Sequence, residues 1–384
     1  MTKTNLGLYV HIPFCERKCN YCDFNSGCYS KITQRKYLDS LLSEIKLESN
    51  FYNNYIVDTI FIGGGTPSLL SAEEITQIVE SIYENFNISN DTEFTIEANP
   101  NSIDLDKLKI YKKLNINRLS IGAQSFINKE LDLLGRIHKA DDITKAIRLA
   151  KEAGFDNINL DLMTSIPKQT FESFSYSLNN AIALDIQHIS IYSLIIEEGT
   201  PFGEMHSKGK SLNLMSEDED RKIYHSLKKI LNKSKFNQYE ISNYAKFGFE
   251  CRHNIKYWQC DDYLGIGLGA HSKVLNTRIE NIDSILDYIN NLNNRISSIK
   301  NKYSLSKLDR LNEKIIMGIR MNRGLCIKEI NKDFGMDFEE NYSSEINKNI
   351  KNGYIEIVNN FIKLTDLGLD FSNIVELDFY RLED

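Results

Sequence analysis

Short apolar runs rich in β-branched residues recur along the first half of the chain. They alternate with segments whose apolar residues are spaced as on a helix. After the first run, Leu38, Leu41, Leu42 and Ile45 predict an amphipathic helix over about residues 34–51. The apolar runs predict six strands, at Leu6–His11, Val57–Ile62, Thr92–Glu97, Arg118–Gly122, Ile158–Met163 and His188–Leu194.

Helix signals separate these strands. Ser71-Ala-Glu-Glu74 has the capping-box pattern, and Asp141 or Asp142 is the expected cap of a helix that runs to Ala153 before Gly154. Further helices are predicted at Asp104–Leu114 and Thr170–Leu184. Such repeats imply parallel strands joined by crossover helices, which close partly or fully into a barrel with its site at the C-terminal strand ends. An open doubly wound sheet gives a similar alternation.

The rhythm breaks after about residue 200. We expect a helix at Glu217–Asn232, a strand at Gln238–Ser242 and a loop at Cys251–Trp258. The Gly-rich segment 263–272 lacks the dinucleotide-binding spacing and a following long helix, so its glycines indicate close backbone packing.

The end of the chain has a pattern of its own. It predicts a winged-helix-like α+β unit, although an acidic chain disfavours DNA as its ligand. The unit consists of helices near Lys307–Arg320, Ile327–Phe334 and Glu340–Asn352 and a Tyr354–Val358/Phe361–Leu364 hairpin turned by Asn359-Asn360.

Composition is that of a globular protein: 384 residues, of which 41% are hydrophobic and 26% charged, with a net charge of −7. The acidic balance and the lack of a long basic run argue against nucleic acid as a partner. The start of the chain has no signal-peptide pattern, and no run is long and apolar enough to span a membrane. We therefore expect a cytoplasmic protein whose seven cysteines are thiols or metal ligands rather than disulfides.

Three of those cysteines, Cys15, Cys19 and Cys22, follow the first predicted strand in a C-x3-C-x2-C spacing. Three thiolates on one loop can hold three irons of a [4Fe–4S] cluster and leave the fourth iron open to another ligand. The alternative is a zinc site completed by His11 or Cys28, although zinc loops more often use paired C-x2-C units. The spacing therefore favours a cluster.

Polar residues and glycines also follow the other predicted strands. Gly63-Gly64-Gly65-Thr66-Pro67 ends the second strand, Glu97 the third, and Gln124 follows the fourth. Asp161 lies late in the fifth strand, and Arg136 can pair a carboxylate bidentately. Taken singly, these are ordinary turn or surface residues. Together they mark one edge of the predicted barrel as a binding site.

The cysteine spacing with Cys22-Asp-Phe24 and Gly63-Gly64-Gly65-Thr66-Pro67 resembles the radical S-adenosylmethionine (SAM) enzymes, over nearly the whole chain. Within them it looks most like the branch that contains the oxygen-independent coproporphyrinogen III oxidases and the heme chaperones. The resemblance implies a partial (β/α)6 barrel, and SAM bound to the open iron, where its reduction gives a 5′-deoxyadenosyl radical. The implied SAM-binding residues are Tyr9, Tyr21, Gly64, Gly65, Thr66, Glu97, Gln124, Arg136 and Asp161.

Position 24 separates the two members of this branch. The oxidases carry a further cysteine two residues after the third ligand, where this chain has Phe24, and a longer arm before the motif. By this resemblance we expect a heme chaperone that binds heme and a cluster with SAM and delivers heme to acceptor hemoproteins. Oxidative decarboxylation of coproporphyrinogen III is the alternative, and a zinc-stapled barrel with an unrelated binding role is a third.

The segment Cys251-Arg-His-Asn-Ile-Lys-Tyr-Trp258 contains the only tryptophan. A histidine can ligate heme iron and aromatic rings can stack on a porphyrin. By resemblance it matches the H-N-x-x-Y-W pattern of the branch, which implies a tetrapyrrole site at His253, Asn254, Tyr257 and Trp258. Cys251 and His271 are rival iron ligands.

The resemblance also predicts the division of the chain and its partners. We expect a barrel over residues 1–200, a barrel extension with the tetrapyrrole segment over 201–300, and the winged-helix-like domain over 301–384. The expected partners are acceptor hemoproteins and, if SAM is cleaved, an electron donor. A peripheral membrane contact is compatible with the sequence.

Overall fold

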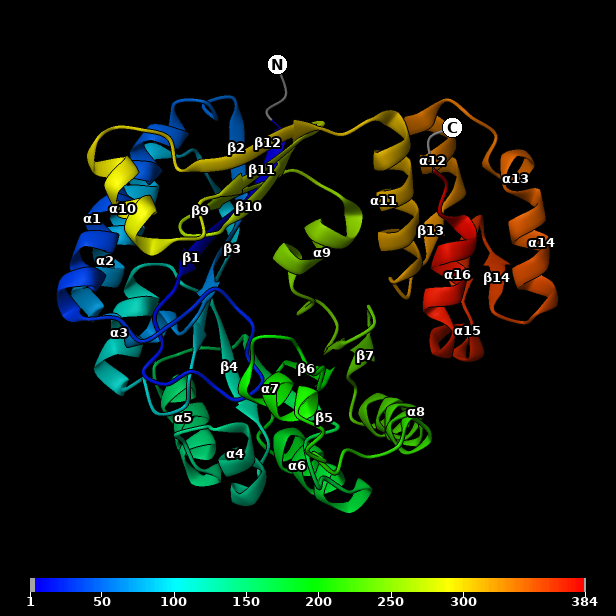
Figure 1. Cartoon of the computed structure of the whole chain (residues 1–384), viewed down its shortest axis with the longest axis horizontal. Helices are drawn as coiled ribbons and strands as arrows, with labels where there is room; N and C mark the ends of the chain where they lie inside the picture. The colour runs from blue at the N-terminus through cyan, green and yellow to red at the C-terminus, as the bar shows by residue number, and fades with distance from the viewer. Residues whose placement is uncertain (1–3, 383–384) are drawn as a thin grey trace.

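A computed structural model describes residues 4–382 of the chain. Its centre is one large sheet in the order β12-β11-β10-β9-β1-β2-β3-β4-β5-β6-β8-β7 (Figure 1). Six consecutive strands run parallel in chain order, which confirms the six predicted strands and a mixed α/β fold built on a large parallel sheet. They are β1 (Thr4–Ile12), β2 (Tyr55–Gly64), β3 (Ile88–Ala98), β4 (Arg118–Gln124), β5 (Ile158–Thr164) and β6 (His188–Ser193).

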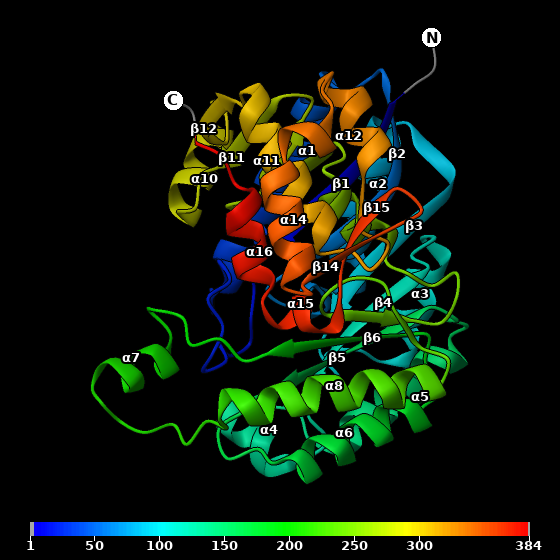
Figure 2. The same ribbon diagram turned by 90° about the vertical axis from the view of Figure 1, so that its right-hand side faces the viewer.

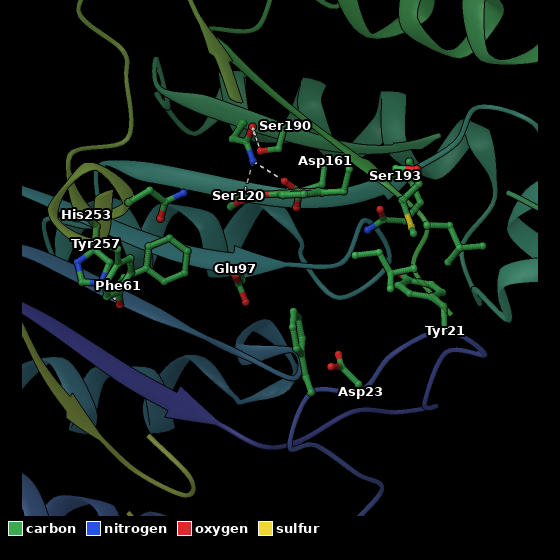
Figure 3. A pocket seen from close by; sticks show the side chains of 18 of the residues that line it. Tyr21, Asp23, Phe61, Glu97, Ser120, Asp161, Ser190, Ser193, His253 and Tyr257 are labelled. Atoms are coloured by element: carbon green, nitrogen blue, oxygen red, sulfur yellow. Dashed lines mark hydrogen bonds between the residues drawn. The ribbon is translucent and has the colours of Figure 1, made fainter. Parts of the chain in front are cut away.

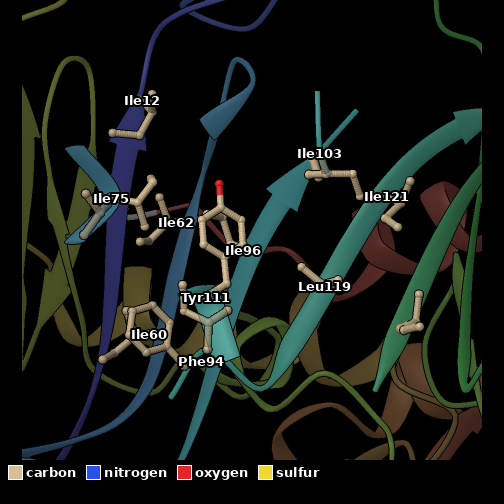
Figure 4. Close-up of a cluster of buried hydrophobic side chains, with 14 of the residues drawn as sticks. Ile12, Ile60, Ile62, Ile75, Phe94, Ile96, Ile103, Tyr111, Leu119 and Ile121 are labelled. Atoms are coloured by element: carbon tan, nitrogen blue, oxygen red, sulfur yellow. The ribbon is translucent and has the colours of Figure 1, made fainter. Parts of the chain in front are cut away.

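The two faces of this parallel sheet differ in chemistry because side chains alternate along each strand. One face is apolar and is buried under the crossover helices, as Figure 4 shows for Ile60, Ile62, Phe94, Ile96 and Leu119. The other face carries polar side chains. The covering helices are α1 (Lys31–Ser49), α2 (Ala72–Asn85), α3 (Leu105–Lys113), α4 (Asn128–Leu134), α5 (Ala140–Glu152) and α6 (Phe171–Ala183).

Side-chain caps start most of these helices. Ser71 and Glu74 form the expected capping box of α2, and Asp104 and Thr170 cap α3 and α6. The expected cap of α5 was wrong. Its N-cap is Lys139, whose backbone N–H donates to the Asp142 carboxylate, so Asp142 lies inside the first turn.

Shorter strands extend the sheet on both sides, and every added pair is antiparallel except the one made with β1, which is parallel. Next to β1 lies β9 (Tyr263–Ile266), followed by β10 (His271–Val274), β11 (Thr277–Asn281) and β12 (Ile299–Ser304). Next to β6 lie β8 (Asn243–Ala245) and β7 (Asn237–Gln238), so the single strand expected at 238–242 was wrong. A Cβ on Gly265 would lie 2.2 Å from the carbonyl oxygen of His271, which bears out close backbone packing in the Gly-rich segment.

The segment 251–258, expected as a loop, is instead helical. It forms α9 (Arg252–Gln259), which lies beside the polar face of the sheet (Figure 1). No side chain of its own caps this helix. The carboxylate of Glu93 on β3 accepts the backbone N–H groups of Arg252 and His253, so the start of α9 is fixed by tertiary structure.

The remaining helices before residue 305 are α7 (Pro201–Ser207), α8 (Glu217–Lys233) and α10 (Ile285–Asn293). The predicted helix at 217–232 is thus confirmed as α8. Among the described residues, no helix combines the length and the apolar composition that crossing a membrane requires.

The C-terminal unit has its own apolar core and is seen from the front in Figure 2. The predicted Asn359-Asn360 turn is confirmed, since both residues have positive φ, as a type I′ hairpin turn requires. The helix expected at 340–352 is divided at Tyr342. The unit consists of α11 (Lys307–Ile319), β13 (Leu325–Cys326), α12 (Ile327–Phe334), α13 (Phe338–Asn341), α14 (Ser343–Lys351), β14 (Ile355–Val358), β15 (Phe361–Leu364), α15 (Asp366–Asp370) and α16 (Ser372–Phe379).

Candidate functional site

The three-cysteine loop begins where β1 ends. Backbone hydrogen bonds from Cys15 to Gly27 and from Gly27 to Pro13 close the loop at its base. Its tip is tied to the far side of the site, because Asn20 donates to the carbonyl of Leu134 through its backbone and to that of Leu133 through its side chain. The loop is therefore held at both ends with its three thiols on one stretch of backbone.

The thiols are half-buried and face hydrogen-bond donors. Arg136 Nη1 lies 3.5 Å from Cys19 Sγ, and Thr66 Oγ1 lies 3.9 Å from Cys15 Sγ. Burial raises the pKa of Cys15 and of Cys22, which favours the neutral thiols. Binding to iron would supply the positive charge that stabilises the thiolates, so these side chains fit a metal cluster.

The geometry does not support a zinc ion held with His11 or Cys28. Both ring nitrogens of His11 are engaged, Nδ1 with the Tyr9 hydroxyl and Nε2 with the carbonyl of Asn25. The Cys28 thiol donates to the Glu16 carbonyl. Within residues 4–382, no three His, Cys, Asp or Glu side chains converge on a single metal position. A cluster differs in this respect, since each thiolate binds its own iron.

The glycine segment after β2 packs directly against the cysteine loop. The Gly65 N–H donates to the carbonyl of Ile12, and a Cβ at this position would lie 2.7 Å from the Phe14 carbonyl oxygen. Gly64 has φ of +114°, and its N–H donates to Glu97 Oε2 at 3.0 Å. Only glycine tolerates both the close approach and the backbone conformation, so this segment can bring main-chain groups against a ligand.

A small cavity of about 130 Å³ opens beside the three cysteines. It brings together every predicted SAM-binding residue except Tyr9. The predicted residues on its wall are Cys15, Cys19, Cys22, Tyr21, Gly64, Gly65, Thr66, Glu97, Gln124, Arg136 and Asp161.

Asn99 is a member of this wall that the sequence analysis missed. It donates to Thr66 Oγ1 at 2.9 Å and accepts from Arg136 Nη2 at 2.5 Å, which fixes the guanidinium. Arg136 Nη2 also donates to the carbonyl of Gly122. The available signal was the position of Asn99, two residues after Glu97 at the end of the same strand.

A larger cavity of about 500 Å³ adjoins the small one over the polar face of the sheet (Figure 3). The two share Tyr21, Phe24, Glu97, Gln124 and Asp161 among their lining residues. Tyr9 lines the larger one, together with Phe61 and the helix α9. The predicted cofactor residues therefore lie between the cysteine loop and a cavity large enough for a second ligand.

Glu97 and Asp161 face this boundary and are both half-buried. Burial and the negative charge of Asp161 raise the pKa of Glu97 to about 8. Burial also raises the pKa of Asp161, while the Asn159 amide, which donates to its carboxylate at 2.7 Å, opposes that shift. Two carboxyls whose charged forms are disfavoured are suited to a ligand that brings hydroxyl or ammonium groups.

Asn159 and Ser190 were also not predicted, although both line the larger cavity. The Asn159 amide bonds Ser120, and its oxygen accepts from Ser190 and contacts His188 Nδ1. Polar residues at alternate, inward-facing positions of the predicted strands were the signal that would have found them.

Three of the four predicted tetrapyrrole residues, His253, Asn254 and Tyr257, line the larger cavity, and Trp258 does not. His253 Nδ1 is 2.9 Å from the Thr59 hydroxyl, and Nε2 is 2.9 Å from the Tyr257 hydroxyl. Burial, with the charges of Lys256 and Arg118, lowers the pKa of His253 to about 3, so its imidazole is neutral. This neutral ring can ligate iron only if one of its two hydrogen bonds, to Thr59 or to Tyr257, is broken.

The rival residues lie elsewhere. Cys251 is buried with its thiol against Glu93. His271 is an exposed residue on the wall of a third cavity, which shares lining residues with the larger one but does not include His253. His188 is fully buried between Asn159 and Tyr239, and His138 contacts the carbonyl of Ala123. Neither His188 nor His138 lines the small or the larger cavity.

Comparison with known proteins gives consistent matches. Residues 9–180 match the Radical SAM superfamily and residues 305–371 the HemN C-terminal domain. The fold is similar to that of a solved structure described as coproporphyrinogen III oxidase (HemN) from Escherichia coli, with a TM-score of 0.86 and 24% identity over 98% of this chain and 90% of that one.

Curated relatives cover the same length. The chain is 34% identical to a protein named Heme chaperone HemW from Bacillus subtilis, over 96% of this chain and 97% of the relative. It is 40% identical to a protein of the same name from Escherichia coli, over 70% of each. The chain therefore belongs to the HemW family of the radical SAM superfamily.

Proposed function

We propose that this protein is a heme chaperone, which binds heme, holds a [4Fe–4S] cluster with SAM, and passes heme to acceptor hemoproteins. The relatives named Heme chaperone HemW match nearly the whole chain, which supports a shared activity. The observation that carries the proposal is the pair of adjoining cavities, one beside three half-buried thiols and the other large enough for a tetrapyrrole.

The side chains of the small cavity fit the cofactors that the superfamily implies. Cys15, Cys19 and Cys22 would hold three irons, and the fourth would bind SAM, whose reductive cleavage is the chemistry that this pair supplies when an electron donor is present. The glycine segment would lie against the methionine part. Glu97 and Asp161 would accept hydrogen bonds from hydroxyl or ammonium groups, and Arg136 would orient a carboxylate.

The larger cavity would hold heme. Aromatic side chains of Phe61, Tyr257 and Phe24 lie on its wall and offer faces to a flat ring. His253 is the proposed iron ligand, and it would exchange its contact with Tyr257 for the metal. Asn254 and Tyr257 lie beside it on the cavity wall, and Trp258 lies outside the cavity.

Phe24 bears on the choice between chaperone and oxidase. It stands where the oxidases carry a further cysteine, its side chain is 61% exposed, and it lines both cavities. This arrangement places an apolar ring, rather than a thiol, between the proposed cofactor and the proposed cargo. It supports heme handling over oxidative decarboxylation.

The decisive experiment uses the full chain, reconstituted anaerobically with iron and sulfide. Heme titration should give saturable binding with a defined Soret band, and incubation with an apo-hemoprotein should move that heme to the acceptor. The same preparation, given coproporphyrinogen III, SAM and a reductant, should form no protoporphyrinogen IX. Turnover of coproporphyrinogen, or failure to bind heme, would contradict the proposal. We place the protein in the cytoplasm, where heme acceptors are made.

A further inference from the structure

The larger cavity contains a buried cation without a partner. Arg118, the first residue of β4, lines this cavity and is only 1% exposed. Among residues 4–382 its guanidinium has no carboxylate within the 4.0 Å of an ion pair, and its Nε is buried without a hydrogen-bond acceptor. An unpaired buried charge is costly, so a group in this position calls for a ligand.

The acids nearest to Arg118 are engaged with other groups. The carboxylate of Glu93 accepts the backbone N–H groups of Arg252 and His253 and contacts the Cys251 thiol. Asp161 accepts from the Asn159 amide. Both acids act on Arg118 through their charge, and neither forms an ion pair with it. The guanidinium therefore keeps its donors available to the cavity.

Charge distribution marks Arg118 as the anion-binding position of the cavity. Four acids line the cavity, Asp23, Glu97, Asp161 and Glu197. Arg118 is the only lining side chain in the described part of the chain that is positively charged at neutral pH, because His253 is neutral. A ligand that carries a carboxylate would find its one cationic partner among these lining side chains at Arg118.

The strand register gives the direction in which such a ligand would lie. Ser120 pairs with Glu97 on β3, and Arg118 pairs with Thr95, one inward-facing position nearer the start of the strands. The backbone of Arg118 thus lies about 7 Å, two residues along the strand, before the level of Glu97. A carboxylate bound there would leave the rest of the ligand beside Phe61 and Tyr257.

We propose that Arg118 binds a propionate carboxylate of the heme and so orients the tetrapyrrole in the larger cavity. This inference rests on the proposed function and assigns a residue that the H-N-x-x-Y-W segment does not contain. Arg118 can donate two parallel hydrogen bonds to one carboxylate, a geometry that lysine and glutamine cannot reproduce.

A structural role is the rival explanation, in which Arg118 only balances the charges of Glu93 and Asp161. The two roles differ in what they predict for the ligand. A structural arginine would be indifferent to whether the heme carries free or esterified propionates. A propionate-binding arginine would discriminate strongly between them, because an ester has no negative charge.

The test is titration of the cluster-loaded, full-length protein with heme and with heme dimethyl ester, both added from the same cosolvent and followed by the Soret band. We expect the wild type to bind heme at least tenfold more tightly, about 1.4 kcal/mol. Arg118→Gln should bring the two affinities to parity by weakening heme alone, and Arg118→Lys should retain part of the preference. Arg252→Gln is the matched control, since Arg252 is close by on α9 but does not line the cavity.

Each outcome decides the matter. Equal affinity of the wild type for heme and ester would overturn the role of Arg118 and leave heme binding intact, even if Arg118→Gln failed to fold. An undiminished preference for heme in a folded Arg118→Gln, judged by circular dichroism and iron content, would also overturn it. A wild type that binds neither ligand would overturn the proposed function together with this inference.

Discussion

The thiols of Cys15, Cys19 and Cys22 lie half-buried, and hydrogen-bond donors beside two of them favour the negatively charged thiolate. Because burial raises the pKa of Cys15 and Cys22, these two thiols are protonated in the metal-free loop, and iron binding must displace their protons. We expect Cys→Ala at any of the three to remove the broad absorption near about 400 nm that thiolate-bound clusters give. Iron analysis after anaerobic reconstitution measures the loss.

The control for this loop is Cys28→Ala. Its thiol donates to the Glu16 carbonyl and lies away from the small cavity, so the variant should keep the iron content of the wild type. An unchanged iron content in the variant that lacks all three predicted ligands would rule out the cluster assignment.

Glu97 makes the pH dependence of SAM binding a second test. Burial and Asp161 raise its pKa to about 8, so at pH 7 the free protein carries a protonated carboxyl. If the carboxylate accepts hydrogen bonds from SAM, binding must release that proton. We expect SAM affinity to rise from pH 7 to pH 9 (about tenfold at most), with proton release visible by calorimetry in buffers of different ionisation enthalpy.

The variants Glu97→Gln and Asp161→Ala complete this test. Glu97→Gln should abolish the proton release, and both should weaken SAM binding about tenfold or more while iron content stays constant. Equal SAM affinity in the wild type and both variants would refute the assignment. The same shift affects folding stability. Because the pKa of Glu97 is higher in the folded protein than in the unfolded chain, its contribution to the free energy of unfolding falls as the pH rises from 4.5 to about 8.

The heme ligand gives a third prediction at this scale. His253 is neutral and lines the larger cavity, whereas Cys251 is buried against Glu93 and His271 lies on another cavity. We expect His253→Ala to abolish or shift the Soret band of the heme-loaded protein. Cys251→Ala and His271→Ala serve as controls and should leave the spectrum unchanged. An unaltered spectrum and affinity in His253→Ala would exclude His253 as the ligand.

At the scale of elements, α9 is the helix on which the larger cavity depends. It has eight residues and no side-chain cap of its own, so it is too short to be stable alone. The Glu93 carboxylate accepts two of its unpaired backbone N–H groups and complements the positive end of its dipole. The start of α9, and with it His253, is therefore held from β3.

Glu93→Ala should consequently destabilise the protein by about 2–4 kcal/mol, because two buried donors lose a charged acceptor. Chemical denaturation measures the loss, and Glu80→Ala, on the exposed side of α2, is the control that should change little. Heme affinity should fall with stability, and iron content should not. A loss below about 0.5 kcal/mol would show that α9 does not need this acceptor.

The sequence predicted the elements that follow a local rule and missed those fixed by distant contacts. The six parallel strands and the helices capped by Ser71, Asp104 and Thr170 carry their own signals. The start of α9 depends on Glu93, 159 residues away from Arg252, and no local pattern encodes that contact. The short strands β7 to β12 also depend on contacts beyond their own sequence, since each is defined by the neighbouring strand with which it pairs.

The same distinction applies to the candidate site. Glu97, Gln124 and Asp161 were predicted because they lie at the end of, just after or late in successive strands, and the C-terminal ends of parallel strands meet at one edge of the sheet. Asn99 and Arg118 follow no motif. Asn99 is identified by its hydrogen bond with Arg136, and Arg118 by an Nε that has no acceptor. Both observations require the assembled structure.

At the scale of the whole molecule, the C-terminal unit has a separate core and is docked beside the domain of the large sheet. Polar contacts join it to α8, where Arg221 and His225 face Asp370 and Lys228 faces Asp366. Partly exposed ion pairs of this kind contribute little each. Backbone contacts add to them, since the Asn322 N–H donates to the carbonyl of Tyr239.

The docked unit also contacts the helix α9. Lys314 on α11 donates to the carbonyl of Gln259, the last residue of α9, at 2.8 Å. A cation at the C-terminus of a helix complements the negative end of its dipole, as Glu93 complements the opposite end. The short helix that carries His253 is thus held at one end by β3 of the large sheet and at the other by the C-terminal unit.

We expect Lys314→Ala to loosen α9 while the fold and the cysteine loop stay intact. The loss of a terminal cation contributes about 0.3–1 kcal/mol, so heme affinity should fall by up to about fivefold. Hydrogen exchange should accelerate over Arg252–Gln259, and iron content should not change. Lys307→Ala is the matched control, because Lys307 lies exposed on the same helix. If both lysine variants gave the same heme affinity and exchange rates as the wild type, the C-terminal unit would have no part in positioning the tetrapyrrole segment.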